Sequence, residues 1–209
     1  RVRQVVVAAG DLLAHRVVTF EFIGDTDYFN ESPNEPRVRG SKCTSIDAAF
    51  THRLPNGVIE LVLIEWKYTE KYAPRRIDPT NDAVRWGRYG STWSAPDSPV
   101  RTDLVSFDTL LAEPFYQLMR QQLLAWRIEN DPAQDAGRVK VVHVHSPAND
   151  AYQHSIYTPA LAALGDKVDE VWSKLLKYPD RYSVMNPTVF CDPSVTSAEY
   201  VLRYAEERS

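Results

Sequence analysis

Alternating apolar and polar positions predict four strands. Residues 15–23 alternate and are rich in β-branched and aromatic side chains, and residues 138–145 show the same pattern later in the chain. Residues 44–52 and 58–68 are two further apolar runs on either side of residues 55–57 (Pro-Asn-Gly), a typical hairpin turn. The first part of the chain therefore predicts antiparallel strands.

Helical spacing predicts three helices in the second half. Residues 113–130 carry the clearest pattern, with Pro114 at the first helical position and Pro132 just beyond the end. Residues 158–177 and 197–207 are the other two, the first interrupted by a glycine and the second capped by a serine.

Two segments predict loops. Residues 24–42 are rich in Gly, Pro and Asn, and residues 70–108 are polar and proline-rich and mix arginines with aromatics. A loop as long as the second is expected to be functional, partly disordered or interrupted by short elements. The order of elements predicts a mixed α/β sheet flanked by helices. We expect a single domain over residues 1–209, with a core at about 15–146 and a C-terminal helical portion at about 158–209.

The side-chain faces decide the hairpin register. A three-residue loop at 55–57 makes one face wholly apolar, whereas a two-residue loop would turn one strand over and mix the faces. The apolar pairs are then Ile46 with Trp66, Ala48 with Ile64, and Phe50 with Val62. The other face pairs Thr51 with Leu61, Ala49 with Leu63, and Asp47 with Glu65.

That register places two carboxylates, Asp47 and Glu65, opposite each other, with Lys67 on the same face. Like charges so placed are destabilising unless something compensates. A bound divalent cation is one compensation, and a local ion triad neutralised by Lys67 is the other. The spacing alone does not choose between them.

Asp47 followed by Glu65-Trp66-Lys67 at the end of an apolar strand resembles the signature of the PD-(D/E)XK nuclease superfamily, in its bacterial restriction-endonuclease-like members. The resemblance is tightest over residues 44–72 and 113–126, and the strand at 139–144 follows in the expected order. It implies a restriction-endonuclease-like fold, a mixed β-sheet with α-helices on both faces.

The resemblance also implies a chemistry. Asp47, Glu65 and the backbone carbonyl of Trp66 are expected to hold Mg²⁺, which Mn²⁺ should replace. A water would be deprotonated to attack a phosphodiester, and Lys67 would orient it or offset charge in the transition state. The expected activity is that of an endonuclease acting on DNA, in restriction or defence; nothing in the spacing excludes RNA.

Three further polar residues are candidates for the same site. Glu21 lies inside an apolar strand and is a candidate extra metal ligand, with a solvated edge-strand glutamate as the alternative. Gln117 and Gln121 share one helix face. The resemblance favours Gln117 as the glutamine that approaches the catalytic residues, and Gln121 is a candidate for substrate binding.

Basic and aromatic residues alternate in the segment 70–108, a mixture that suits phosphate contacts and base stacking. The candidates for substrate binding are Arg75, Arg76, Arg85 and Arg88, with Trp86, Tyr89 and Trp93 among them. The alternative is a solvated loop whose aromatics pack onto the domain.

Composition narrows the function classes further. The chain has 24 Lys and Arg against 28 Asp and Glu, a net charge of −4, which excludes a globally basic nucleic-acid binder but not a local basic patch. Two cysteines, the absence of a recognisable signal peptide and the lack of a long apolar run predict a cytoplasmic protein with no membrane partner. Nucleases of the resembled kind often form homodimers, so a homodimer is an assembly that the resemblance allows.

Two other functions stay open at this point. One is a non-catalytic nucleic-acid-binding or interaction domain that retains the nuclease fold. The other is a zinc hydrolase using His143 and His145, which share one strand face. Structural histidines with satisfied hydrogen bonds are the more ordinary reading of that pair.

Overall fold

Five strands form one mixed sheet in the order β1-β2-β3-β4-β5. The structure is a computed structural model, and it describes residues 18–37, 43–67, 70–192, 194 and 196–204. The strands are β1 Thr19–Phe22, β2 Ile46–Arg53, β3 Ile59–Lys67, β4 Arg138–His145 and β5 Tyr182–Met185. β1, β2 and β3 pair antiparallel, and β4 and β5 continue the sheet in parallel with β3.

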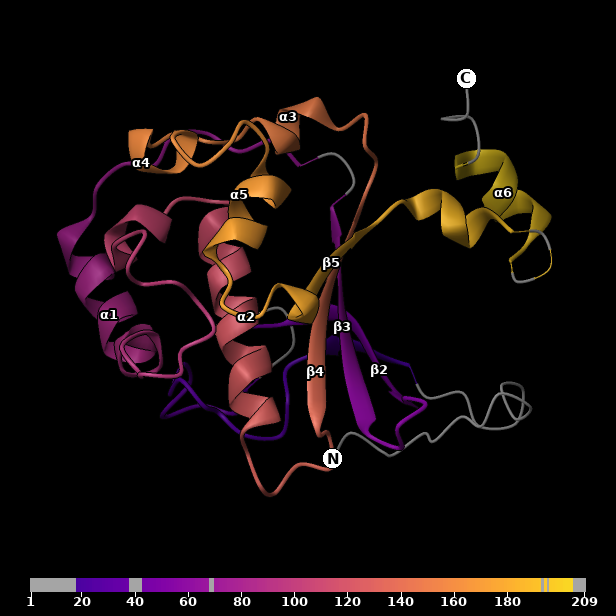
Figure 1. The fold of residues 1–209 in the computed structure, drawn as a ribbon, viewed down its shortest axis with the longest axis horizontal. Coiled ribbons are helices and arrows are strands. Elements are labelled where there is room, and N and C mark those ends of the chain that lie inside the picture. The colour runs from indigo at the N-terminus through magenta and orange to yellow at the C-terminus, as the bar shows by residue number, and fades with distance from the viewer. Residues whose placement is uncertain (1–17, 38–42, 68–69, 193, 195, 205–209) are drawn as a thin grey trace.

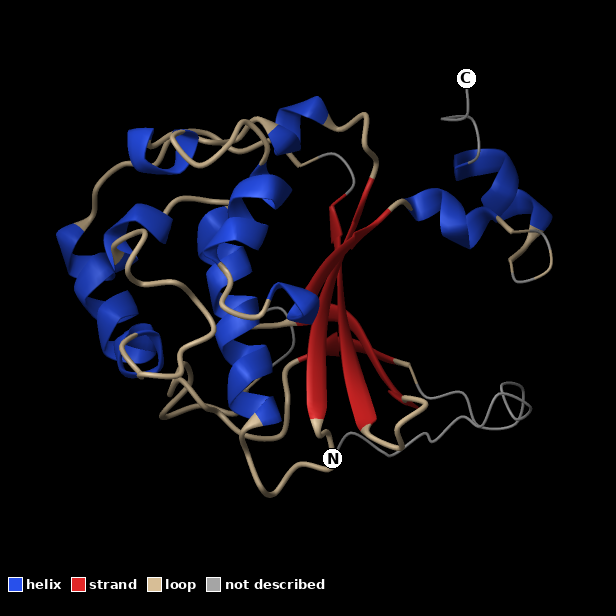
Figure 2. Ribbon diagram, viewed as in Figure 1, coloured by secondary structure: helices blue, strands red, loops and turns tan. Residues whose placement is uncertain are grey.

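Helices form the connections wherever the sheet is parallel, because parallel neighbours need a crossover. α1 (Pro79–Trp93), η1 (Phe107–Leu110) and α2 (Phe115–Glu129) lie between β3 and β4 in the chain. α3 (Asp150–Gln153), α4 (Pro159–Ala162), α5 (Val168–Leu175) and η2 (Pro179–Arg181) lie between β4 and β5, and η3 (Pro187–Cys191) and α6 (Ala198–Tyr204) follow. In Figure 1, α1, α2, α4 and α5 stand on one side of the sheet, and η3 and α6 on the other. This mixed sheet flanked by helices (Figure 2) is the predicted α/β class and is consistent with a restriction-endonuclease-like fold.

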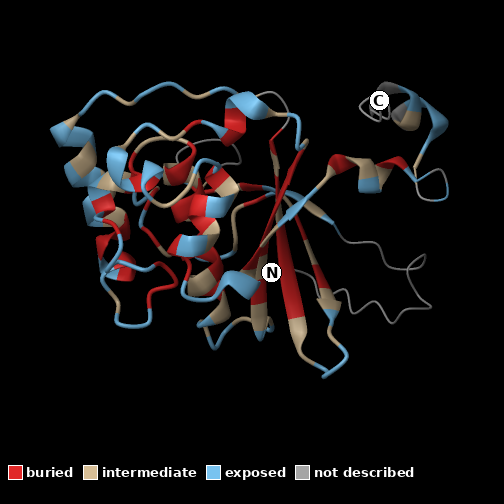
Figure 3. Cartoon of the chain, turned by 45° about the horizontal axis from the view of Figure 1, so that its top comes forward, coloured by how far each residue is buried: buried red, intermediate tan, exposed pale blue. Residues whose placement is uncertain are grey.

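The main core lies between the sheet and α2. Leu61 and Leu63 of β3 pack there with α2 residues such as Leu123 and with Trp172 of α5, all at most 1% exposed. Figure 3 shows this buried layer running along the sheet and the inner side of α2, while the outer side of α1 is exposed. The strand that carries the candidate chemistry is therefore fixed on its helix side.

A second, smaller apolar cluster covers the other side of the sheet. Val62, Val142 and Val144 form its buried part, and Trp66 packs there against Phe190 of η3 with ring centroids 4.8 Å apart. β3 is thus apolar on both faces over most of its length, as a strand buried on both sides requires.

The predicted hairpin register is confirmed. Its pairs run from Arg53 with Ile59 to Ala48 with Ile64, around the expected three-residue turn in which Gly57 has a φ of 86°. One detail differs from the prediction: Ile46 does not share the face of Trp66 but packs with Phe22 in the main core. The printed backbone pairing of β2 with β3 stops before Ile46, so Ile46 follows its pairing with β1 instead.

Of the alternatives for the segment 70–108, the structure shows that it contains elements: η1 and the helix α1, which with 15 residues is longer than the short elements expected. Tyr89 and Trp93 are buried in the core, and the Trp86 ring packs edge-on against Phe107 at 5.1 Å. Gly90 has the space of its missing Cβ filled by the Trp86 ring. Gly90 therefore makes room for an aromatic residue that packs α1 against the domain.

The boundaries of other helices and strands also differ from the prediction. The single helix predicted at 158–177 is two helices, α4 and α5, that end and begin on either side of Gly165. The first predicted strand begins at Thr19, and its predicted residues 15–17 lie outside the described residues. β5 and α3 were not predicted, because each has only four residues and little periodicity.

Leu63 is fully buried at the centre of β3, so Leu63→Ala should lower the free energy of unfolding by about 2–5 kcal/mol. Val189→Ala, at a side chain that is 52% exposed on η3, should change it by less than about 0.5 kcal/mol. Urea denaturation of both variants and the parent measures the difference. Equal, small effects would contradict the placement of β3 in the core.

Candidate functional site

Polar side chains form a row across the sheet near the C-terminal end of β3. The β3–β4 register pairs Glu65 with His143 and Lys67 with His145. Asp47 lies one position beyond the last β2–β3 pair, across from Glu65, and Glu21 lies between two β1–β2 pairs, across from Asp47. Four strands thus contribute to one row.

Asp47 is exposed, and its carboxylate Oδ2 accepts a hydrogen bond from the backbone amide of Trp66 at 2.7 Å. This bond lies just past the last backbone pair of β2 and β3. The aspartate therefore holds the two strands together at the place where their ladder ends, with its carboxylate beside the Glu65-Trp66 peptide.

Glu65 and Lys67 form a buried ion pair, each 4% exposed, with Lys67 Nζ donating to Glu65 Oε1 at 2.7 Å. Gln117 Nε2 donates to the same oxygen, also at 2.7 Å. Burial raises the pKa of Glu65, the Lys67 charge opposes this, and the Asp47 charge adds to it. The two carboxylates therefore repel each other, and Lys67 only partly offsets the effect.

The first turn of α2 positions Gln117. Phe115 and Leu118 are each 1% exposed and fix this turn in the core, and the Glu113 carboxylate accepts the Gln117 backbone amide at 3.1 Å. Of the two glutamines, Gln117 is therefore the one that contacts the acidic pair.

Gln121, one helical turn further on, is fully buried and contacts His143 instead. Its Oε1 accepts from His143 Nε2 at 3.0 Å, and Tyr152 donates to the other ring nitrogen at 3.3 Å. Burial and the nearby Lys67 charge lower the pKa of His143 to about 3, so the ring is neutral. In this position Gln121 supports β4, and its side chain has no exposed surface for the predicted substrate contact.

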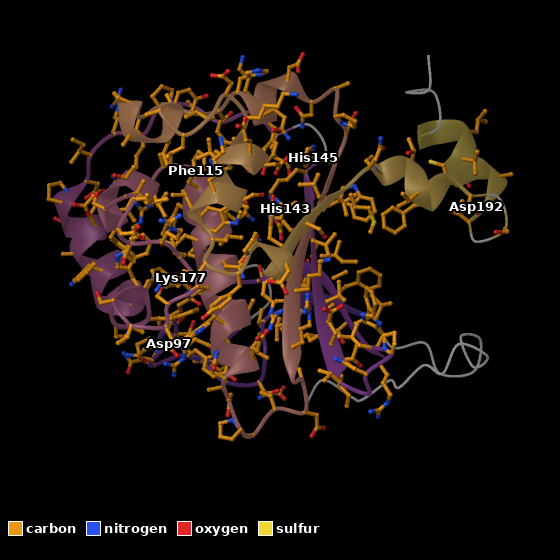
Figure 4. All side chains as sticks on the ribbon, viewed as in Figure 1. Asp97, Phe115, His143, His145, Lys177 and Asp192 are labelled. Carbon is orange, nitrogen blue, oxygen red and sulfur yellow. The ribbon has the colours of Figure 1, made fainter. Side chains whose placement is uncertain are left out.

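His145 forms a second buried pair, with Asp169 of α5. Its Nε2 donates to Asp169 Oδ2 at 2.6 Å and its Nδ1 to the Ser146 carbonyl at 3.0 Å. Burial opposes protonation, but the Asp169 hydrogen bond and charge outweigh it and raise the pKa of His145. Tyr182 also donates to Asp169, at 2.7 Å. Figure 4 shows His143 and His145 along β4.

Both histidines therefore have protein partners, which agrees with the structural reading of the pair. Among the residues that the structure describes, no group of three or more His, Cys, Asp or Glu side chains is arranged to hold a metal ion. The zinc-hydrolase alternative gains no support from this geometry.

Of the predicted substrate-binding arginines, Arg85 and Arg88 lie on α1, and Arg75 and Arg76 lie in the loop before it. Arg75 and Arg85 both pair with Asp82, and Arg85 also stacks 4.4 Å from the Tyr116 ring centroid. Arg88 donates to the Glu31 carbonyl at 3.4 Å, while Arg76 is exposed. Arg76 is the one of the four that this geometry leaves most accessible.

Glu21 lies exposed on the edge strand β1 with a left-handed φ of 48°. Such a backbone is uncommon for a residue other than glycine and is found often at functional sites. The register puts Glu21 next to Asp47, but among the described residues neither belongs to a group of three or more His, Cys, Asp or Glu side chains that could hold a metal ion. Its role as a ligand stays a prediction.

Several residues of this region were not predicted. Tyr72 lies close enough to the acidic pair that, besides burial, the charges of Glu113, Glu70 and Glu65 raise its pKa. Asp169 and Tyr152 complete the histidine contacts. In the sequence, Asp169 is one of several acids on an amphipathic helix, and only the fold shows that it is the one turned toward β4.

Comparison with known proteins places the chain in a family. Residues 4–205 match the family described as Restriction Endonuclease associating with ARP, and the chain belongs to it. No curated protein and no solved structure matches the chain. In the described part of the chain, no helix has the length and apolar character needed to cross a membrane.

Asp47→Asn should raise the free energy of unfolding at neutral pH by roughly 1 kcal/mol, because it removes the charge that opposes ionised Glu65 and keeps an oxygen for the Trp66 amide. Because the pKa of Glu65 is raised, this carboxyl group stays protonated up to a higher pH in the folded state than in the unfolded state. The parent therefore loses stability as pH rises from the ordinary glutamate pKa through the raised one.

The gain should accordingly vanish below the ordinary glutamate pKa, where Glu65 is protonated in both states. Urea denaturation of parent and variant in EDTA, at acidic and neutral pH, measures this. Asp97→Asn, at another exposed aspartate, is the matched control. A loss of stability at neutral pH would show that Asp47 does not destabilise the folded site.

Proposed function

We propose that the chain is a metal-dependent endonuclease of the PD-(D/E)XK type that hydrolyses DNA phosphodiester bonds, with Asp47, Glu65 and Lys67 as its catalytic residues. The observation that carries the proposal is that two carboxylates, Asp47 and Glu65, face each other beside a buried lysine, Lys67, at the C-terminal end of β3. Membership in a family named for restriction endonucleases supports the same reaction class.

The donor set fits Mg²⁺. This ion takes one or two carboxylates and keeps several waters, so two carboxylates and the Trp66 carbonyl suffice as protein ligands. The raised pKa of Glu65 is a second sign, because a cation between the carboxylates would relieve the repulsion. Lys67 and Gln117 both donate to Oε1 of Glu65, and the backbone amide of Asp47 also bonds the Glu65 carboxylate.

Mg²⁺, when bound there, would supply a lowered pKa for an attacking water and positive charge beside the phosphate. Lys67 would then stand next to the reacting phosphate and offset the negative charge that develops on it. Gln117 would hold Glu65 in place through its amide, and its position on the first turn of α2 makes it a second polar contact for the water. Glu21 is the candidate for an additional ligand from β1.

DNA is the proposed substrate because the family is named for restriction endonucleases. The exposed Arg76 and Lys71 lie on the segment that leads from β3 to α1, close to the catalytic end of the sheet. Cations in this position suit phosphates on either side of the one that is cut. The net charge of −4 makes this local distribution, and not the whole surface, the attractive element.

Asp47→Asn and Lys67→Met should each reduce Mg²⁺-dependent DNA cleavage by about 100-fold or more, because the first weakens a proposed ligand of the metal and the second removes the cation that offsets charge at the reacting phosphate. Gln117→Ala should reduce it by roughly 10-fold, since it acts on Glu65. Plasmid and short-duplex cleavage measures the rates.

Lys167→Met is the matched control, since Lys167 is exposed at the start of α5. Full activity in folded Lys67→Met would overturn the assignment. If the folded parent cuts neither DNA nor RNA with Mg²⁺ or Mn²⁺, a non-catalytic nucleic-acid-binding domain of the same fold becomes the better description.

Metal binding can be tested without cleavage. Millimolar Mn²⁺ should raise the thermal midpoint of the parent by a few degrees, because a ligand of the folded state stabilises it by mass action. Asp47→Asn should lose this shift, and Asp97→Asn should keep it. A shift of the same size in Asp47→Asn would mean that the ion binds elsewhere.

A further inference from the structure

A groove lies beside the candidate catalytic residues and has no role in the proposed chemistry. It has a volume of about 520 Å³, within the range of sites for small ligands. The segment before α1 forms one wall with Pro74 and Ile77, and Tyr157 and Thr158 before α4 form the other. Figure 1 shows these two segments together at the end of the molecule where β3 ends.

The groove has an apolar floor that is open to solvent. The side chain of Ile77 is 83% exposed and that of Tyr157 is 38% exposed. Pro79 and Ala112 add further apolar surface. Exposed flat and branched side chains in a hollow of this size suit a planar ring better than a flexible aliphatic chain.

Two polar groups in the groove could bind the edge of such a ring. Thr158 Oγ1 is buried and has no hydrogen-bond partner among the described residues, which is costly for a hydroxyl. The exposed Asp108 carboxylate is an acceptor for an amino group. The other acid that lines the groove, Asp82, is already paired with Arg75 and Arg85.

The groove is linked to the candidate catalytic residues through Tyr72. The Tyr157 hydroxyl donates to the backbone carbonyl of Tyr72. Tyr72 in turn lies near Glu65, whose charge contributes to its raised pKa. The exposed cations Lys71 and Arg76 lie on the same segment before α1. A phosphate chain at the catalytic residues could thus enter the groove with its charge matched.

We infer that this groove binds one unstacked nucleobase of the nucleic-acid strand, next to the phosphate that is cut. The ring packs on Ile77 and Tyr157, and an amino-bearing edge meets Thr158 Oγ1 and Asp108. The inference rests on the proposed function, since it names how the substrate of that site is held. It favours bases with exocyclic amino groups, because Asp108 accepts and does not donate.

Binding of the full chain to two labelled 15-nucleotide DNA strands tests this by fluorescence anisotropy in metal-free buffer. One strand has mixed sequence, and the other has the same charge but an abasic site at every position. Tyr157→Ala should weaken binding of the mixed strand by about 5- to 100-fold, as loss of a base stack does, with little effect on the abasic strand. Ile77→Ala and Thr158→Val should act in the same direction.

Leu202→Ala is the matched control for Ile77→Ala, because Leu202 is 73% exposed on α6. Equal binding by all variants, or equal weakening of both strands, would overturn the inference and leave the cleavage tests of Asp47 and Lys67 unaffected. A parent that binds neither strand would also overturn it. In that event, cleavage by the parent would show that the proposed function still holds.

Discussion

The site depends on one unfavourable interaction that the fold enforces: two carboxylates face each other at the end of β3, and one of them is buried. Asp47 holds the Trp66 amide, and Glu65 is held by Lys67 and Gln117. These contacts keep the charges in place without removing their repulsion. A sheet that needed only stability would put apolar or oppositely charged residues there. The arrangement is therefore one that the proposed cation would stabilise.

Different contacts on the two sides of β4 hold this arrangement in place. On the helix side, His143 and His145 bind Gln121 and Asp169, which ties the strand beside β3 to α2 and α5. On the other side, Val142 and Val144 pack in the small apolar cluster. Polar contacts have directions, and apolar ones do not. The histidine contacts thus set the position of β4 along α2 and α5, while the valines supply burial.

The hairpin and its acidic pair could be predicted from the sequence, because strand alternation and a three-residue turn leave one register that separates the faces. Gln117 could be predicted because helical spacing is regular. α1 could not, because its segment is polar and proline-rich, and the packing of the Trp86 ring over Gly90 is visible only in the fold. Asp169 could not either, since a helix shows which residues share a face but not which distant strand it meets.

The separation in sequence between paired strands has a consequence for folding. β2 and β3 are neighbours in sequence, so their hairpin closes a short loop and can form quickly. The pairing of β3 with β4 closes the much longer loop from Lys67 to Arg138. Closing it costs more chain entropy, which the contacts between the two strands offset only after they have formed. Asp47 and Glu65 can therefore meet while still hydrated, and Glu65 loses its water only when β4 and α2 arrive. Acidic conditions, which neutralise Glu65, should ease that late step and speed folding relative to neutral pH.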